Sequence, residues 1–260
     1  MRPERSRSRS VGHPGKVLIA ARDAVMTFLF PDRCVACGTP LDASRRHLCS
    51  VCESGLLARD GSLALPALGG APGCPRTGGR AFYALEFEGV TRAMVHALKY
   101  DGRTSLAATL AAIAVPAALS ACDAPPDIVT PVPLHPLRLR ERGFNQSDLL
   151  AARLASGMNV PVRTTLVRVR STPPQARLPR RERLAMPPSA FRAPAGGADL
   201  GRVLLVDDVV TTGATLAAAS LALLGAGAAE VICFALAGTP SRAPAGRTSP
   251  KAVDCAVGEH

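Results

Sequence analysis

The amino-acid sequence predicts an α/β fold, in which a parallel sheet is covered by helices on both faces. From Ala81 onward, short apolar runs typical of strands alternate with longer runs typical of helices. The 260-residue chain is 47 % hydrophobic, which is enough to bury a sizeable core, although it holds no Trp, 2 Tyr and 7 Phe. Two C-x-x-C turns between Cys34 and Cys52 further predict a small metal-binding module that precedes this domain.

The chain divides into four parts by composition. Residues 1–16 are rich in Arg and Ser and are expected to form a disordered basic tail. Residues 17–80 are expected to hold a helix, the cysteine module and a linker, which is poorly structured from residue 54 on. The α/β domain is expected over residues 81–240, and residues 241–260 are expected to be a second disordered tail.

The apolar segment over residues 17–30 follows a basic start, so a signal peptide has to be considered. Arg22 and Asp23 interrupt the segment, and no small-residue cleavage site follows it. Its apolar residues recur at helical spacing, which predicts a short amphipathic helix docked on the protein and favours a cytoplasmic location. No run reaches the roughly 20 apolar residues that a membrane span needs.

Within the α/β domain, the pattern predicts five strands, over residues 81–87, 127–133, 164–169, 201–208 and 230–237. It predicts four helices, over residues 90–100, 105–119, 145–156 and 213–226. We expect the second helix to be broken or to end near Pro116, because proline removes a helical hydrogen bond. Asn145 is expected to be the N-cap of the third helix, and a long basic loop is expected from Arg170 to about Pro188.

Two adjacent carboxylates, Asp207 and Asp208, follow the apolar run 203–206, which has the character of a central parallel strand. In an open α/β sheet the ligand crevice lies beyond the carboxyl ends of such strands. Two like charges side by side repel each other, so we expect a ligand to hold them. Both a sugar diol and Mg²⁺ suit carboxylate oxygens.

The residues after the acid pair predict a phosphate site. They are small or carry hydroxyls, and they lead into a helix: Thr211, Thr212, Gly213, Ala214 and Thr215. A helix N-terminus offers unpaired N–H groups and the positive end of a dipole to a phosphate. The stretch is therefore interpreted as a ribose-5-phosphate cradle, with the acids on the diol and the loop on the phosphate.

The stretch has two other interpretations. A Walker-B-type strand would need a G-x-x-x-x-G-K-[ST] partner, which the sequence lacks. An ordinary strand–turn–helix has no need for the acid pair.

The formal net charge of +11 predicts a polyanionic partner, which means nucleic acid, phosphorylated metabolites or an anionic membrane surface. The predicted basic loop holds five candidate residues for binding single-stranded DNA: Arg170, Arg177, Arg180, Arg181 and Arg183. Because stacking aromatics are scarce, such binding is expected to be mostly electrostatic. The same loop is also a candidate lid over the site, and a merely solvated surface is the third interpretation.

Four cysteines, Cys34, Cys37, Cys49 and Cys52, form the pattern C-x₂-C, eleven residues, C-x₂-C. Each C-x-x-C turn can direct two thiolates to one ion, so the pattern predicts a closed structural zinc site. A secreted disulfide framework is the alternative, and the lack of a signal peptide weighs against it. The other four cysteines are expected to be unbound, with Cys233 in a core strand.

The stretch "VLLVDDVVTTGAT" closely resembles the phosphoribosyl diphosphate (PRPP) signature of type I phosphoribosyltransferases. The segments "LFPDRCVACG", "HALKYDGR", "PVPLHPLRLRERGFNQ" and "RSTPPQARLPRRER" resemble the competence protein F (ComF) family, in the family's order over about residues 28–240. The resemblance implies a type I phosphoribosyltransferase fold preceded by a zinc ribbon. It also implies binding of PRPP with Mg²⁺, a link to DNA uptake in natural transformation, and competence-machinery proteins as partners.

The resemblance places the diphosphate of PRPP on the loop after the first core strand, "PVPLHPLRLRERGF". The cations in that loop and just ahead of it are Arg138, Arg140, Arg142 and Lys99. The implied reaction is transfer of the phosphoribosyl group to an acceptor that the sequence does not name, with no catalytic residue assigned. A single-stranded DNA-binding competence factor and a PRPP sensor without transferase activity are the alternative functions.

Overall fold

A five-stranded sheet forms the centre of the protein. The computed structural model describes residues 32–42, 44–56, 60–65, 79–169, 188–193 and 200–239. The strands are β1 (Gly61–Ala64), β2 (Arg80–Glu86), β3 (Ile128–Pro131), β6 (Arg202–Val210) and β7 (Glu230–Gly238), in the order β1-β2-β7-β6-β3. All neighbours are parallel except β1, which runs antiparallel to β2.

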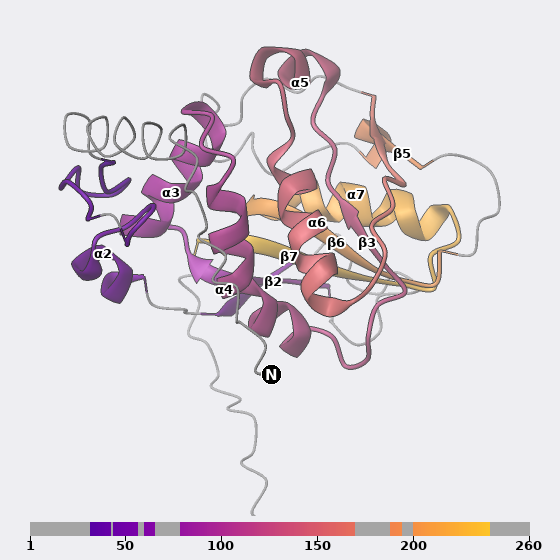
Figure 1. Cartoon of the computed structure of the whole chain (residues 1–260). Helices are drawn as coiled ribbons and strands as arrows, with labels where there is room; N and C mark the ends of the chain where they lie inside the picture. Colours follow the sequence, from indigo (N-terminus) through magenta and orange to yellow (C-terminus); the bar gives the residue numbers. More distant parts are fainter. Residues whose placement is uncertain are drawn as a thin grey trace, which may run out of the picture.

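Helices cover both faces of this sheet, which confirms the predicted fold class. The helices α3 (Gly89–Tyr100), α4 (Leu106–Ser120) and α6 (Gln146–Met158) pack on one face, and α7 (Ala214–Gly225) packs on the other (Figure 1). Successive residues of β6 alternate between the two cores, with Leu204 packed toward α4 and α6 and Leu205 toward α7. Cys233 is buried in the core on β7, as predicted.

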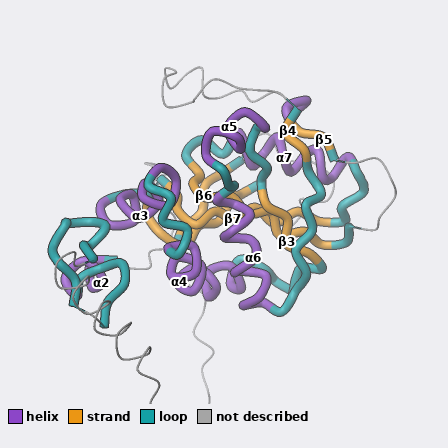
Figure 2. Tube along the Cα trace, turned by 45° about the horizontal axis from the view of Figure 1, so that its top comes forward, coloured by secondary structure: helices purple, strands orange, loops and turns teal. Residues whose placement is uncertain are grey.

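Three short elements lie outside the central layers. The helix α2 (Ser50–Gly55) belongs to the cysteine module, and α5 (Pro136–Arg142) follows β3. The third is a two-stranded sheet made of β4 (Val167–Arg168) and β5 (Phe191–Arg192). The short 3₁₀ helix Pro188–Ala190 directly precedes β5. Figure 2 shows α5 and the β4–β5 sheet at the same end of the main sheet.

The strand predicted over residues 164–169 was expected in the parallel sheet, and this prediction was wrong. Only Val167 and Arg168 form a strand, and they pair with β5. A single parallel bridge joins Val129 of β3 to Val162. In that register residues 167–168 lie beyond the last residue of β3, so the main sheet offers them no backbone partner.

Two other predictions about the elements were wrong. The helix α4 continues through Pro116 to Ser120, because Ala114 and Ala118 on either side of the proline are fully buried in the core and hold the last turn in place. The linker after residue 54 contains β1, which pairs with β2 from Gly61↔Tyr83 to Ala64↔Arg80. Backbone hydrogen bonds at a sheet edge hold this strand, and they leave no periodic side-chain pattern.

Several predictions concern residues outside the described ranges. These are the basic tail over 1–16, the helix over 17–30, the greater part of the basic loop over 170–188 and the tail over 241–260. Among the residues that are described, no helix has both the length and the apolar character needed to cross a bilayer.

Candidate functional site

Three elements meet at the acid pair. Asp207 and Asp208 lie near the carboxyl end of β6. The hydroxyl of Ser147, from the first turn of α6, donates to Asp207 Oδ1 at 3.0 Å. Lys99, from the last turn of α3, places its Nζ 2.8 Å from Asp208 Oδ1, and both side chains of this ion pair are largely buried. The predicted acid pair therefore lies in a pre-formed polar site near the carboxyl end of the interior strand β6.

Asp207 is the acid of the pair whose pKa is shifted. Burial, together with the neighbouring charge of Asp208, raises the pKa of Asp207 to about 7. The backbone N–H of Asp208, which donates to Asp207 Oδ1 at 2.8 Å, the charge of Lys99 and the Ser147 hydroxyl act in the opposite direction. Since the pKa of Asp207 is raised, a ligand that brings positive charge to the acid pair favours the ionised form of this carboxyl.

The loop after β6 encloses a small cavity at the N-terminus of α7 (Ala214–Gly225). Thr211, Thr212, Gly213, Ala214 and Thr215 line a small cavity of about 30 Å³ that also reaches Asp207. Gly213 has a left-handed backbone (φ 75°) and is the N-cap of α7, so the first helical turn begins here. The first N–H of that turn, at Ala214, donates to Thr212 Oγ1 at 3.4 Å. Thr239 supports the loop, since its hydroxyl donates to the carbonyl oxygen of Thr211 at 3.3 Å.

A second, larger cleft of about 330 Å³ adjoins Lys99. Besides Lys99 it is lined by residues of α3, of α5 and of the segments after them, including Tyr100, Arg138, Glu141, Arg142 and Phe144. Arg138 pairs with Glu141 at 2.7 Å, and Arg142 Nη1 donates to Gln146 Oε1 at 2.6 Å.

Of the four cations predicted to bind the diphosphate, the structure places three in this cleft and one outside it. Lys99, Arg138 and Arg142 line the cleft, whereas Arg140 is exposed on α5 and is not among the lining residues. Part of the segment predicted to be a loop, Pro136–Arg142, is in fact the helix α5, with His135 as its N-cap. In a helix, residues four apart share a face and the residue between them points elsewhere, which explains why Arg140 is separated from the other two.

Sequence reasoning missed three residues of this site: Ser147, Tyr100 and Arg168. Ser147 and the N-cap Asn145 are neighbours, and Asn145 Oδ1 accepts a hydrogen bond from the Ser147 backbone N–H at 3.2 Å, which confirms the predicted cap. Arg168 interacts favourably with the charge of Asp207 while burial lowers the pKa of its guanidinium. No sequence pattern distinguishes these residues from ordinary helix or strand positions.

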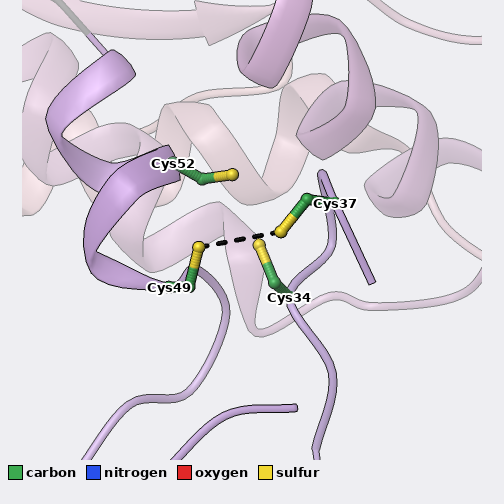
Figure 3. Close-up of side chains that lie close together, drawn as sticks. All are labelled: Cys34, Cys37, Cys49 and Cys52. Carbon is green, nitrogen blue, oxygen red and sulfur yellow. Dashed lines mark hydrogen bonds between the residues drawn. The ribbon is translucent and has the colours of Figure 1, made fainter. Parts of the chain in front are cut away.

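The four predicted zinc ligands do come together (Figure 3). The sulfurs of Cys34, Cys37, Cys49 and Cys52 all lie within 4.8 Å of one another, and the sulfurs of Cys37 and Cys49 are 3.7 Å apart. A zinc ion with Zn–S bonds of about 2.3 Å in a tetrahedron requires sulfurs about 3.8 Å apart, so the donor set fits zinc. Cys34 is buried with Leu41 and Leu48 in the same core as α3 and α4.

The five arginines predicted to bind single-stranded DNA lie outside the described residues, which resume at Pro188.

Comparison with known proteins places these features in context. The model of the phosphoribosyl transferase domain matches residues 145–260, which include the acid pair and the loop after it. DNA utilization protein YhgH of Salmonella typhimurium is 34 % identical over 225 residues, covering 80 % of this chain and 98 % of that protein. Competence protein F of Haemophilus influenzae is 36 % identical over 115 residues, which is 43 % of this chain and 50 % of that protein.

Among solved structures, orotate phosphoribosyltransferase from Aeropyrum pernix is 20 % identical, with a TM-score of 0.30 over 72 % of this chain and 90 % of that chain.

Proposed function

This chain belongs to the family of the DNA utilization and competence F proteins, and we propose on that premise that it binds PRPP together with Mg²⁺. One observation carries the proposal. Asp207 and the Thr211–Thr215 loop line one cavity at the carboxyl end of β6, and Asp208 is the next residue of the same strand, so a carboxylate and the N-terminus of α7 are available to one ligand. A ribose with a 5-phosphate needs this combination of acceptors for its diol and donors for its phosphate.

In the proposed complex, Asp207 and Asp208 accept hydrogen bonds from the ribose hydroxyls, and the loop N–H and hydroxyl groups bind the 5-phosphate. Lys99, Arg138 and Arg142 supply the positive charge for the diphosphate from the adjoining cleft. Bound Mg²⁺, which prefers carboxylate and phosphate oxygens, would neutralise further charge on the diphosphate. The preorganised cations stabilise the charge that develops on the diphosphate as it leaves.

The proposed reaction breaks the bond between the ribose anomeric carbon and the diphosphate, and forms a bond between that carbon and an acceptor nucleophile. Incubation with PRPP, Mg²⁺ and candidate acceptors, with diphosphate release as the readout, tests the transferase step. Calorimetric titration with PRPP and Mg²⁺ alone tests binding. Binding without diphosphate release for any acceptor would favour a PRPP sensor, and a wild-type protein that binds no PRPP would contradict the proposal as a whole.

We further propose that the four cysteines bind one structural zinc ion. A module of this size has little apolar surface to bury, and a metal centre with four thiolates stabilises such small folds.

A second candidate function is the handling of single-stranded DNA. Two relatives are named for DNA utilization and for competence, and the chain carries a net charge of +11. Counterion release from a phosphate backbone would supply the affinity.

A further inference from the structure

The cleft beside Lys99 contains an aromatic ring that the rest of the fold leaves open. Tyr100 is the last residue of α3, and it is 65 % exposed although it lines the cleft. The other tyrosine of the chain, Tyr83, is buried on β2. An exposed ring at the wall of a cleft offers a planar apolar surface of the kind on which nucleobases stack.

Two neighbours hold this ring in place. The guanidinium carbon of Arg142 lies 5.1 Å from the centroid of the Tyr100 ring, and the ring of His96 lies 4.7 Å away, centroid to centroid, at an interplanar angle of 45°. Arg142 is itself anchored by its hydrogen bond to Gln146 Oε1 at 2.6 Å. The ring is therefore oriented before a ligand arrives, which lowers the ordering cost of binding.

The charges of the cleft suit an anion beside the ring. Lys99, Arg138 and Arg142 contribute three positive charges, and their acidic partners Asp208 and Glu141 contribute two negative ones. Lys99 and Arg138 each pair with a carboxylate, whereas Arg142 donates to the neutral amide of Gln146, so the charge of Arg142 is the one left in excess. A phosphate next to Tyr100 would meet this guanidinium first, because Arg142 lies against the ring.

We propose that this cleft binds a nucleotide, with the base stacked on Tyr100 and the phosphate held by Arg142 and Arg138. The volume of about 330 Å³ is at the lower end of the range of small-ligand sites and suits one nucleotide. The nucleotide is either a free mononucleotide or one unit of a single strand, since both present a base and a phosphate. This site goes beyond the proposed phosphoribosyl site, because it requires neither Asp207 nor the Thr211–Thr215 loop.

The test uses two probes with the full-length protein in the absence of PRPP, because the two proposed sites share the arginines. One probe is deoxyadenosine monophosphate, titrated by calorimetry, and the other is a fluorescently labelled twelve-residue deoxyadenosine strand, titrated by anisotropy. Tyr100→Ala is expected to weaken binding by at least about fivefold, because base stacking on an aromatic ring contributes roughly 1–3 kcal/mol and about 1.4 kcal/mol is one decade. Tyr100→Phe keeps the ring and is expected to bind like the wild type.

Matched controls separate the ring and the charge from general effects. Arg142→Ala is expected to weaken binding, whereas Arg153→Ala, which removes an exposed arginine from α6 outside this cleft, is expected to leave it unchanged. Thermal melts of all variants identify any loss that comes from unfolding. Asp207→Asn is expected to reduce PRPP binding but to leave nucleotide binding intact, so failure of the phosphoribosyl proposal and failure of this one are distinguishable.

Each outcome has a definite meaning. Tyr100-dependent binding of both probes supports the proposal with a free nucleotide as a sufficient ligand, and Tyr100-dependent binding of the strand alone supports it with the strand as the source. Binding of neither probe, or binding that Tyr100→Ala leaves unchanged, overturns it.

Discussion

Lys99 and Asp208 are 109 residues apart in the sequence, yet Lys99 Nζ lies 2.8 Å from Asp208 Oδ1 near the carboxyl end of β6. The pair connects α3 to β6, and so connects the basic cleft to the acid pair. With 19 % and 13 % of the two side chains exposed, water screens the interaction only in part. The lysine thus balances one of the two adjacent carboxylates in the ligand-free protein.

Replacing Lys99 is expected to destabilise the fold through this pair. Lys99→Met keeps most of the aliphatic stem but leaves Asp208 without its cation, which is expected to cost about 1–2 kcal/mol, between the values for exposed and fully buried pairs. A double-mutant cycle with Asp208→Asn, measured by denaturant unfolding, isolates the pairwise contribution. Additive effects in the cycle would show that the contact contributes nothing to stability.

Asp207 and Asp208 are expected to be required for PRPP binding. Replacing both with Asn keeps their shape and removes the charge, and hydrogen bonds to charged groups contribute roughly 1.5–3 kcal/mol each. PRPP affinity in the presence of Mg²⁺ is therefore expected to fall by on the order of a hundredfold or more, measured by calorimetric titration. A variant that binds PRPP as tightly as the wild type would exclude the acid pair from the site.

Stability of the ligand-free protein is expected to respond to Asp207 differently from a structural carboxylate. Because burial and Asp208 raise the pKa of Asp207 to about 7, the folded state holds a proton that the unfolded state releases near pH 4. The free energy of unfolding of the wild type is thus expected to fall as the pH rises from about 4 to about 7. The side chain in Asp207→Asn does not titrate, so the free energy of unfolding of this variant is expected to fall less over the same pH range. At pH 8 it is expected to match or exceed the wild-type value. Denaturant unfolding of both proteins across this range checks the prediction. Parallel curves would show that the pKa of Asp207 is the same in the folded and unfolded states.

Removal of the zinc ligands is expected to abolish metal binding and to loosen the module. Elemental analysis is expected to find about one zinc ion per wild-type chain and none in a Cys34→Ser, Cys49→Ser double variant. Since Leu41 and Leu48 of the module pack in the same core as α3 and α4, the double variant is also expected to melt at a lower temperature. Cys122→Ser is the control, because Cys122 lies outside the four-cysteine cluster. Unchanged zinc content in the double variant would rule this site out.

The basic segment after β4 is expected to contribute to binding of single-stranded DNA. Replacing Arg180, Arg181 and Arg183 with Ala is expected to weaken binding of all sequences about equally and to make it less sensitive to salt. Anisotropy titrations at several salt concentrations give both quantities. If affinity and salt slope both stay at the wild-type values, the binding surface lies elsewhere, and the Tyr100 cleft becomes the first alternative.

Features encoded in contiguous residues were predictable. The acid pair and the Thr211–Thr215 loop belong to one uninterrupted stretch, so a strand that leads directly into a helix necessarily places the loop next to Asp207. The four cysteines were equally accessible, because each C-x-x-C turn places two sulfurs side by side before any long-range packing occurs. The alternation of strands and helices likewise predicted the parallel sheet and its two covered faces.

Features that depend on how distant segments pack were decided only by the tertiary structure. Nothing in the sequence pairs Lys99 with Asp208 or directs Ser147 to Asp207, because those contacts arise where α3 and α6 dock on the sheet. Arg138, Arg140 and Arg142 lie in one short segment, which predicted a shared site for all three. In the helix α5, Arg138 and Arg142 line the cleft and Arg140 does not. Local sequence determined which chemical groups this protein carries. Docking of the helices on the sheet determined which of those groups face one another, because side-chain direction follows from backbone geometry and backbone geometry follows from burial of the apolar faces.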